Sequence, residues 1–509
     1  MRTQNSIKNA ITAVIMQISV ILFGFIIQKV LLNYLGLEYT GLNSLFSNII
    51  SMLAIVELGI GSAITFHLYK PIAEDDRQQI KILMKFYKIC YRVIAVIVFI
   101  IGIIIIPFLP KIVGEVNIDE NIVIIYLLFL LDTILSYLFT YKRTIIIANQ
   151  RNYYINIIHT ATYTFFTIIQ IVVTIYLKNF YAYLIIKVIS RFIENIIISH
   201  FANKLYPFIK EKEDKKMPKE VLDDIIKKVK ALFVHKISSF LVSGTDNIII
   251  STFLGVTTVG YYSNYSMVIN ALTILISQIF AGLTASIGNL LVKENNDKIY
   301  EVFKKIYFIN FVVGVIGTTG IVLVINNIIT ICFGEQYILS MFIVFTLAFT
   351  FYFNITRQCM GQFKEAAGIF YEDRFIPLIE SLVNLVFSII FLKFFGLAGV
   401  FMGTIMSSMV LHLYSYPKFV YKGVLKRRYK EYFKMFFSYT CLAIIIILAS
   451  YFIKDSISAN NFIISTILSI IIAIMIPTII IIILFRKKDE YKFFKEMIIN
   501  KILRRKESL

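Results

Sequence analysis

Long apolar runs separated by short polar segments make up most of the chain, and apolar and polar positions do not alternate strictly within them. Several runs reach about 20 residues, which is enough for a helix to cross the hydrocarbon core of a bilayer, about 30 Å thick. A transmembrane barrel would show short alternating segments instead. The pattern predicts an all-α polytopic membrane protein with about fourteen transmembrane helices. The predicted spans are 11–32, 42–68, 87–110, 121–141, 155–177, 181–201, 232–254, 260–290, 306–332, 338–358, 375–395, 397–417, 434–453 and 461–485.

Lysine and arginine are distributed very unevenly over the connections between these spans. With a cytoplasmic N-terminus, the even-numbered connections and the tail lie inside and hold most basic residues, as the positive-inside rule expects. The outer connections hold few basic residues, which are Lys111, Lys178, Lys393 and Lys454. The distribution supports the span count and predicts that both termini are cytoplasmic. The net charge of +20 then reflects topology and contact with anionic lipid, and we expect no nucleic-acid partner.

The chain contains an internal repeat. "NYLGLEYTGLNSLFSNIISM" (33–52) aligns with "TFLGVTTVGYYSNYSMVINA" (252–271) at an offset of 219, so that Gly41 meets Gly260. "IYLKNFYAY" (175–183) aligns with "IFLKFFGLA" (390–398) at an offset of 215. Each copy holds six spans, so both copies have the same orientation, which is a parallel repeat typical of transporters. The predicted organisation is an N-terminal lobe (1–203), a cytoplasmic linker (204–230), a C-terminal lobe (231–422), spans 13–14 (423–485) and a basic cytoplasmic tail (486–509) that resembles an interfacial helix.

Several ionisable side chains fall inside predicted spans, where insertion of a charge costs about 2.5–3.5 kcal/mol. Such groups face the interior of the protein and mark sites or paths. Because arginine and lysine both bind phosphate, the cations are candidates for a substrate-binding cleft. The candidate substrate-binding residues are Lys29, Arg92, Lys187, Arg191 and Arg357. For Arg92 and Arg357, anchoring to lipid headgroups is the alternative, and Lys187 could extend outward from its helix.

Oxygen-bearing side chains in the second lobe suggest an ion-coupling site, because hard cations such as Na⁺ prefer oxygen ligands. Its candidate residues are Asp246, Glu380, Asn384 and Thr404, with transfer of H⁺ as the alternative to Na⁺ binding. A static hydrogen bond between helices competes with this role for Asp246. Glu57 and Asp132 are further acidic groups within spans, and Glu194 could form an i, i+3 ion pair with Arg191.

The sequence contains no pattern typical of an enzyme or of a bound cofactor. No P-loop, G-x-G-x-x-G, G-x-S-x-G or H-x-x-x-H occurs. The four cysteines, Cys90, Cys332, Cys359 and Cys441, lack the paired spacing of a metal site, and we expect them to be small core residues. We therefore predict a protein that is not an enzyme and has no cofactor other than a coupling Na⁺ or H⁺.

Two stretches resemble a known family. "NYLGLEYTGLNSLFSNIISMLAIVELGIGSAITFHLYKPIAEDD" and "HKISSFLVSGTDNIIISTFLGVTTVGYYSNYSMVIN" are similar to the Wzx-type oligosaccharide flippases of bacterial capsule and O-antigen pathways. That family shares a superfamily with the MATE multidrug-and-toxin extruders and with the peptidoglycan lipid flippases. In the latter, a sodium site lies in the lobe equivalent to the one that holds Asp246. Gln28 and Lys29 stand where relatives often have an arginine.

The resemblance implies a protein of the bacterial cytoplasmic membrane that moves undecaprenyl-pyrophosphate-linked oligosaccharide to the outer leaflet by alternating access. Its implied partners are this lipid-linked substrate, membrane lipids, and a polysaccharide polymerase with other assembly proteins. The alternatives are a MATE-like multidrug or cation antiporter, a flippase for peptidoglycan precursors, and a membrane scaffold or polymerase. The intramembrane cations favour the first function, and the short outer loops argue against a polymerase.

Overall fold

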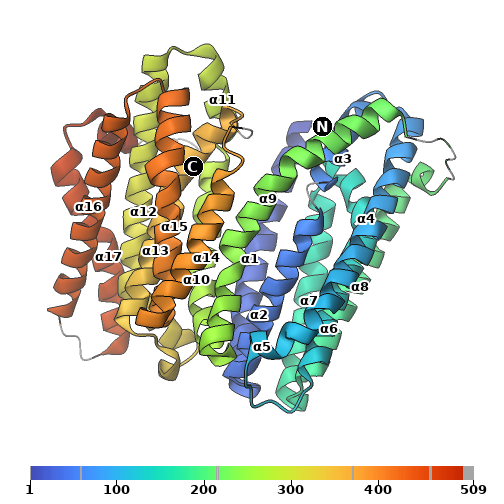
Figure 1. Cartoon of the computed structure of the whole chain (residues 1–509), viewed down its shortest axis with the longest axis horizontal. Helices are drawn as coiled ribbons and strands as arrows, with labels where there is room; N and C mark the ends of the chain where they lie inside the picture. Colours follow the sequence, from blue (N-terminus) through green and yellow to red (C-terminus); the bar gives the residue numbers. More distant parts are fainter. Residues whose placement is uncertain are drawn as a thin grey trace, which may run out of the picture. The chain divides into compact units, whose positions relative to one another are not determined.

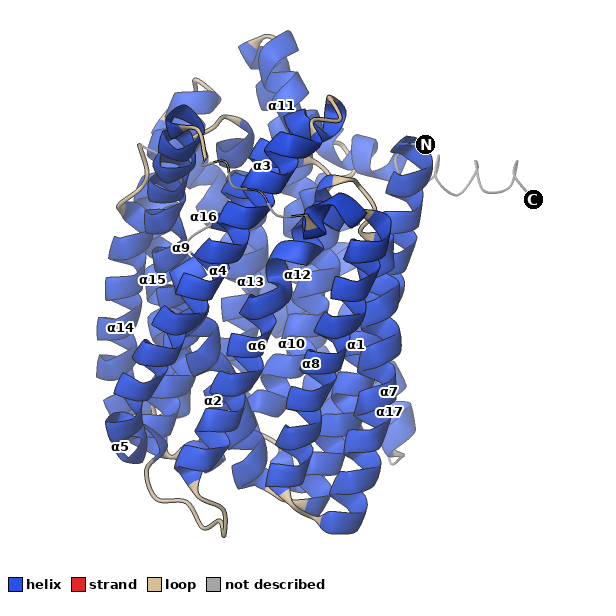
Figure 2. Ribbon diagram, turned by 90° about the vertical axis from the view of Figure 1, so that its right-hand side faces the viewer, coloured by secondary structure: helices blue, strands red, loops and turns tan. Residues whose placement is uncertain are grey.

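The computed structural model describes residues 2–57, 60–211, 213, 215, 217–369, 372–457 and 461–496. In these ranges the chain is helical with short connections and no strand, as Figure 2 shows. The chain divides into two compact units, which are Met1–Ser263 (unit 1) and Asn264–Leu509 (unit 2). The all-α membrane fold predicted from the hydrophobic pattern is therefore confirmed.

Unit 1 contains the helices drawn from blue to green in Figure 1. They are α1 (Arg2–Tyr34), α2 (Leu37–Leu53), the 3₁₀ turn η1 (Ala54–Glu57), α3 (Ile60–Ala73), α4 (Arg77–Ile105), η2 (Ile106–Phe108), α5 (Leu109–Val113), α6 (Ile122–Ala148), α7 (Tyr153–Leu177), α8 (Phe180–Leu205), η3 (Pro207–Lys210), α9 (Lys219–Leu254) and the first two turns of α10 (Val256–Ala281). Within the unit, α1 packs along α7, and α8 packs against both α6 and α7.

Unit 2 begins within α10 and continues to the C-terminal helices, in yellow to red. Its further elements are α11 (Thr284–Lys293), α12 (Asn296–Cys332), η4 (Glu335–Tyr337), α13 (Met341–Ala366), α14 (Ile376–Phe395), α15 (Leu397–Val410), the π-helix η5 (Leu411–Val424), α16 (Tyr429–Asp455) and α17 (Phe462–Phe485). The largest contacts are those of α14 with α15 and of α12 with α13. Of the predicted tail, 489–496 is helical, and 497–509 lies outside the described residues.

Within the described residues, each of the fourteen predicted spans falls on one helix or on two or three consecutive helical elements, and α4, α9 and α12 begin well before the predicted spans. Within the described part, nine helices are long and apolar enough to cross a membrane. The other five predicted spans lie in α2–α3, α8, α9, α10 and α13. The helix α8 carries three charged residues in its middle, and the span predicted over 42–68 is interrupted by η1. For these five, crossing of the membrane remains a prediction from the positive-inside pattern.

Side-chain caps and turn residues explain where several helices begin. The side chain of Asp76 accepts a hydrogen bond from the backbone N–H of Gln79 at the start of α4, and Asn121 and Asn179 cap α6 and α8 in the same way. Gly36 and Gly255 precede α2 and α10 with φ of 109° and 86°, values that favour glycine. The two glycines are 219 residues apart, so the repeat extends to the backbone conformation of the connections.

The two copies of the repeat meet through a pair of close helix contacts inside unit 1. A Cβ atom at Gly41 would lie 2.1 Å from the carbonyl oxygen of Val256, and one at Gly260 would lie 2.5 Å from the carbonyl oxygen of Leu37. These contacts exchange under the 219-residue offset, since 37 maps to 256 and 41 maps to 260. Glycine is required at both positions because any side chain would collide with backbone.

Hydrogen bonds repeat the same symmetry. The amide of Gln28 on α1 donates to Ser263 Oγ on α10 at 3.1 Å, and the amide of Asn247 on α9 donates to Ser44 Oγ on α2 at 3.0 Å. Gln28 maps to Asn247 and Ser44 maps to Ser263 under the offset of 219. The predicted parallel repeat is thus seen as a local pseudo-two-fold arrangement of these four helices.

Candidate functional site

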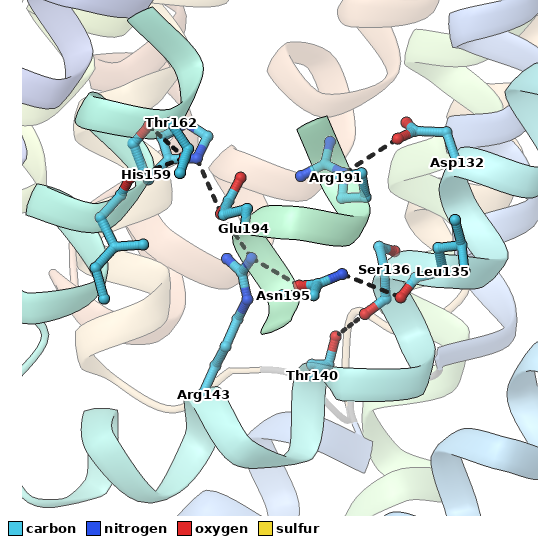
Figure 3. Close-up of polar contacts among 11 residues, drawn as sticks. Asp132, Leu135, Ser136, Thr140, Arg143, His159, Thr162, Arg191, Glu194 and Asn195 are labelled. Atoms are coloured by element: carbon cyan, nitrogen blue, oxygen red, sulfur yellow. Dashed lines mark hydrogen bonds and ion pairs between the residues drawn. The ribbon is translucent and has the colours of Figure 1, made fainter. Parts of the chain in front are cut away.

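A cluster of polar side chains links α6, α7 and α8 within unit 1 (Figure 3). The carboxylate of Glu194, on α8 and 3% exposed, accepts a hydrogen bond from Arg143 Nη2 at 2.6 Å. His159 Nδ1, on α7, lies 3.2 Å from the same carboxylate oxygen. Arg143 Nη2 also donates to Asn195 Oδ1 at 3.0 Å, and the Asn195 amide donates to the carbonyl of Leu135 at 3.1 Å. One buried carboxylate therefore holds three helices together.

A second ion pair lies one turn away along α8. Arg191 Nε is 3.2 Å from Asp132 Oδ1, and Asp132 is buried on α6. Arg191 therefore pairs across helices with Asp132, and Glu194 takes its hydrogen bond from Arg143, in place of the considered i, i+3 pair. Lys187 lies one further turn along α8 with its ammonium 4.2 Å from the centre of the Phe129 ring. Of the predicted cations, Lys187 and Arg191 are thus brought together.

These side chains line a cavity of 180 Å³ in unit 1. Its polar wall includes His159, Tyr163, Gln170, Tyr183, Lys187, Arg191 and Glu194. Its volume corresponds to roughly six water molecules at about 30 Å³ each. Amide, phenol, ammonium and guanidinium groups together can bind an oxygen-rich or anionic group, because charge-assisted donors form the strongest hydrogen bonds.

The other residues predicted in the first lobe lie outside this cavity. Ile27 of α1 lines it, and Lys29 projects about 200° further round the helix, which places it on a different face. Lys29 and Arg92 are both exposed. Glu57 accepts a hydrogen bond of 2.5 Å from the hydroxyl of Tyr91, so its carboxylate has the structural contact that was considered for it.

The predicted ion-coupling residues are divided between the two units. In unit 2, Arg357 Nη1 lies 3.1 Å from Glu380 Oε1, and the Asn384 amide donates to Thr404 Oγ1 at 3.0 Å. Asp246 lies on α9 in unit 1. The structure therefore joins Asn384 to Thr404, and it pairs Glu380 with Arg357, which had been assigned to the substrate cleft. Among the described residues, no three or more His, Cys, Asp or Glu side chains gather as they would around a metal ion. A sodium site built partly from amide and hydroxyl oxygens stays a prediction.

Arg143 falls outside the predicted fourth span, which ends at residue 141. The helix α6 continues to Ala148, so Arg143 lies within it and reaches Glu194. The apolar run "TIIIA" that follows Arg143 is the signal that the helix continues. His159 is recognisable in the sequence as a polar residue within a predicted span, but only the packing of α7 against α8 shows that Glu194 is its partner.

Residues 6–282, just over half of the chain, match the sequence profile of a family described as "Polysaccharide biosynthesis protein". No curated protein matches the sequence at a significant level.

Several solved structures share the fold. The lipid II flippase MurJ in an inward closed conformation is 15% identical, covers 94% of this chain and 99% of its own length, and has a TM-score of 0.65. An inward-facing multidrug resistance MATE family transporter of the MOP superfamily is 14% identical, covers 78% of this chain and 94% of its own, and has a TM-score of 0.61. A Vibrio cholerae MATE transporter gives 12% identity, coverage of 83% and 99%, and a TM-score of 0.56. At these identities, the likeness establishes the fold of MOP superfamily transporters.

Proposed function

Because the chain belongs to the polysaccharide biosynthesis protein family, we propose that this multi-pass membrane protein is a flippase for lipid-linked oligosaccharides. Its substrate is an undecaprenyl-pyrophosphate-linked repeat unit of a surface polysaccharide such as capsule or O-antigen. It carries this unit from the cytoplasmic to the outer leaflet of the bacterial cytoplasmic membrane by alternating access, with both of its own termini in the cytoplasm. A polysaccharide polymerase and other assembly proteins then use the unit outside.

The observation that carries this proposal is the cationic cavity in unit 1. Two cations, Lys187 and Arg191, line the cavity together with one carboxylate, Glu194, so its lining holds more basic than acidic side chains. Lys187 has no ion-pair partner within the described ranges. An apolar bilayer core excludes a sugar diphosphate, and fixed donors in a polar cavity replace the water that the headgroup loses.

Transport against a gradient needs a driving ion, and we propose that oxygen-bearing side chains bind this ion. Asp246, Glu380, Asn384 and Thr404 are the proposed Na⁺ or H⁺ ligands, and intramembrane carboxylates are the usual groups for such coupling. Glu380 is buried and forms an ion pair with Arg357, and this supports a coupling role that depends on the charge of its carboxylate. Lys29, Arg92 and Arg357 remain proposed contacts of the headgroup at other stages of transport.

The test is flipping of a lipid-linked oligosaccharide in proteoliposomes, combined with deletion of the chromosomal gene. We expect the deletion strain to lose surface polysaccharide and to accumulate lipid-linked repeat units inside the cell. Lys187→Gln should raise the KM for flipping, whereas Lys178→Gln, at an exposed lysine of the same unit, should not. Normal surface polysaccharide in the deletion strain would refute the proposal.

Two alternatives share the fold, because the similar structures include a lipid II flippase and MATE transporters. Flipping of a peptidoglycan precursor in preference to the polysaccharide unit would indicate the first. Altered sensitivity to cationic drugs with unchanged surface polysaccharide would indicate the second. The positive charge of the unit 1 cavity argues against cationic drugs as its ligands.

A further inference from the structure

A stripe of basic residues runs along one face of α4. Lys81, Lys85, Lys88 and Arg92 follow one another at intervals of four, three and four residues, which places them on the same side of a helix. The predicted topology puts the first turns of α4 at the cytoplasmic surface. The three lysines are outside the cavity of unit 1 and have no part in the proposed transport site.

These lysines open onto a second pocket of unit 1, with a volume of 280 Å³. Lys210 of η3 and Tyr141 of α6 complete its polar wall, together with Glu211 and Glu213 of the segment that follows η3. The volume corresponds to roughly nine water molecules at about 30 Å³ each. The pocket can therefore hold a group larger than a single ion.

Carboxylate and carbonyl oxygens of the chain already contact two of the lysines. Lys81 Nζ lies 3.1 Å from Glu211 Oε2 and 3.6 Å from Glu213 Oε2, and Lys85 Nζ donates to the Glu213 carbonyl at 2.6 Å. The Lys81 side chain is 18% exposed and that of Glu213 is 9% exposed. These oxygens occupy the positions that phosphate oxygens would take on the same ammonium groups.

The charges in the pocket do not cancel. Four lysines and two glutamates line it, so it keeps two excess positive charges. No carboxylate pairs with Lys88 within the described ranges, and its ammonium lies 6.0 Å from the centre of the Tyr141 ring. A ligand with two negative charges would neutralise this excess charge.

We propose that this pocket is a cytoplasmic docking site for the diphosphate of the lipid-linked substrate, before the substrate reaches the cavity of unit 1. The inference rests on the proposed function and names a separate site for the same substrate class. Glu211 and Glu213 contact Lys81 in this pocket, and the diphosphate displaces them. Tyr141 lines the pocket and Arg143, two residues later on α6, belongs to the buried cluster, so the pocket and the cluster are built partly on the same turn of one helix.

The experiment measures equilibrium binding of farnesyl diphosphate to the full chain in nanodiscs of neutral lipid. We expect inorganic pyrophosphate to compete. The double variant Lys85→Gln/Lys88→Gln should raise the Kd roughly tenfold or more, since the loss of even one charge-assisted contact is worth about that factor. Glu211→Gln should lower the Kd several-fold, because it removes a competing carboxylate from Lys81.

The control is Lys70→Gln on α3, whose side chain is 82% exposed and pairs with Glu74. It removes one positive charge from outside the pocket, whereas the double variant removes two from its lining, and it should leave the Kd unchanged. An equal effect of Lys70→Gln and Lys85→Gln/Lys88→Gln would show a general surface attraction and overturn the proposal. The proposal would also be overturned if a low mole fraction of phosphatidylglycerol in the nanodiscs abolished the binding of farnesyl diphosphate. The pocket would then hold an anionic membrane lipid.

The two proposals fail in different ways. Flipping of the lipid-linked unit with no dependence of its KM on Lys85 and Lys88 would remove the docking site and leave the proposed function standing. Binding of farnesyl diphosphate that depends on these lysines, in a protein that flips no lipid-linked oligosaccharide, would leave a diphosphate site and remove the proposed function.

Discussion

The ion pair between Arg143 and Glu194 gives a quantitative test of how unit 1 is held together. The Glu194 side chain is 4% exposed and that of Arg143 is 22% exposed, at an N–O distance of 2.6 Å. Removal of one partner from a buried pair typically costs 3–5 kcal/mol, because the other charge stays uncompensated. Arg143 keeps Asn195 as a partner and reaches some solvent, so the lower end of that range applies. We expect Glu194→Leu to cost about 3 kcal/mol of unfolding free energy.

The double variant Arg143→Met/Glu194→Leu should recover most of this loss. Replacement of both charges by apolar side chains of similar size is often neutral or stabilising. The assay is the free energy of unfolding of wild type, the two single variants and the double variant in bicelles, which gives the coupling energy by a double-mutant cycle. A coupling energy below about 0.5 kcal/mol, or a double variant less stable than both single variants, would refute a buried ion pair that stabilises unit 1. Flipping by the stable double variant then reports whether the pair also serves transport.

Three other changes test separate parts of the structure. Gly41→Ala should lower the melting temperature, since its Cβ would collide with a carbonyl oxygen of α10 and overpacking costs about 1–3 kcal/mol. The control Gly24→Ala should not lower it, because no atom lies within 4 Å of the added Cβ. Equal effects of the two substitutions would contradict the close contact at Gly41. Asp246→Asn should abolish gradient-driven flipping while the protein still inserts, so unchanged dependence on Na⁺ or H⁺ would assign Asp246 a structural role. Arg357→Met should reduce thermal stability because it leaves Glu380 buried and unpaired, and Glu380→Gln added to it should restore much of the loss.

The predicted and observed ion pairs differ in how far apart the two partners lie along the chain. The pairing of Arg191 with Glu194 was considered because residues three apart share a face of α8. In the structure, each of them finds a partner on α6, 59 and 51 residues away. Spacing along one helix identifies which side chains lie near each other, but the neighbouring helix decides the partner. The same holds for Arg357, which was expected in a cationic cleft and instead contacts Glu380 on the next helix.

The sequence by itself determined the helical membrane fold, the approximate positions of the helices, and the repeat. These features depend on local quantities, namely the length of apolar runs, the glycine and proline breaks, and the distribution of lysine and arginine. The offset of 219 between Gly41 and Gly260 even indicated which helix ends are equivalent. It did not show that each glycine lies against the other copy's backbone.

Only the tertiary structure decided which charges neutralise one another and which line a cavity. Arg143, His159 and Glu194 are separated by up to 51 residues, and they meet because α6, α7 and α8 pack side by side. Ion pairing inside a membrane depends on distances of a few ångströms between helices, and no pattern along one helix contains those distances. The hydrophobic pattern therefore places the charges at membrane depth, and helix packing determines their partners.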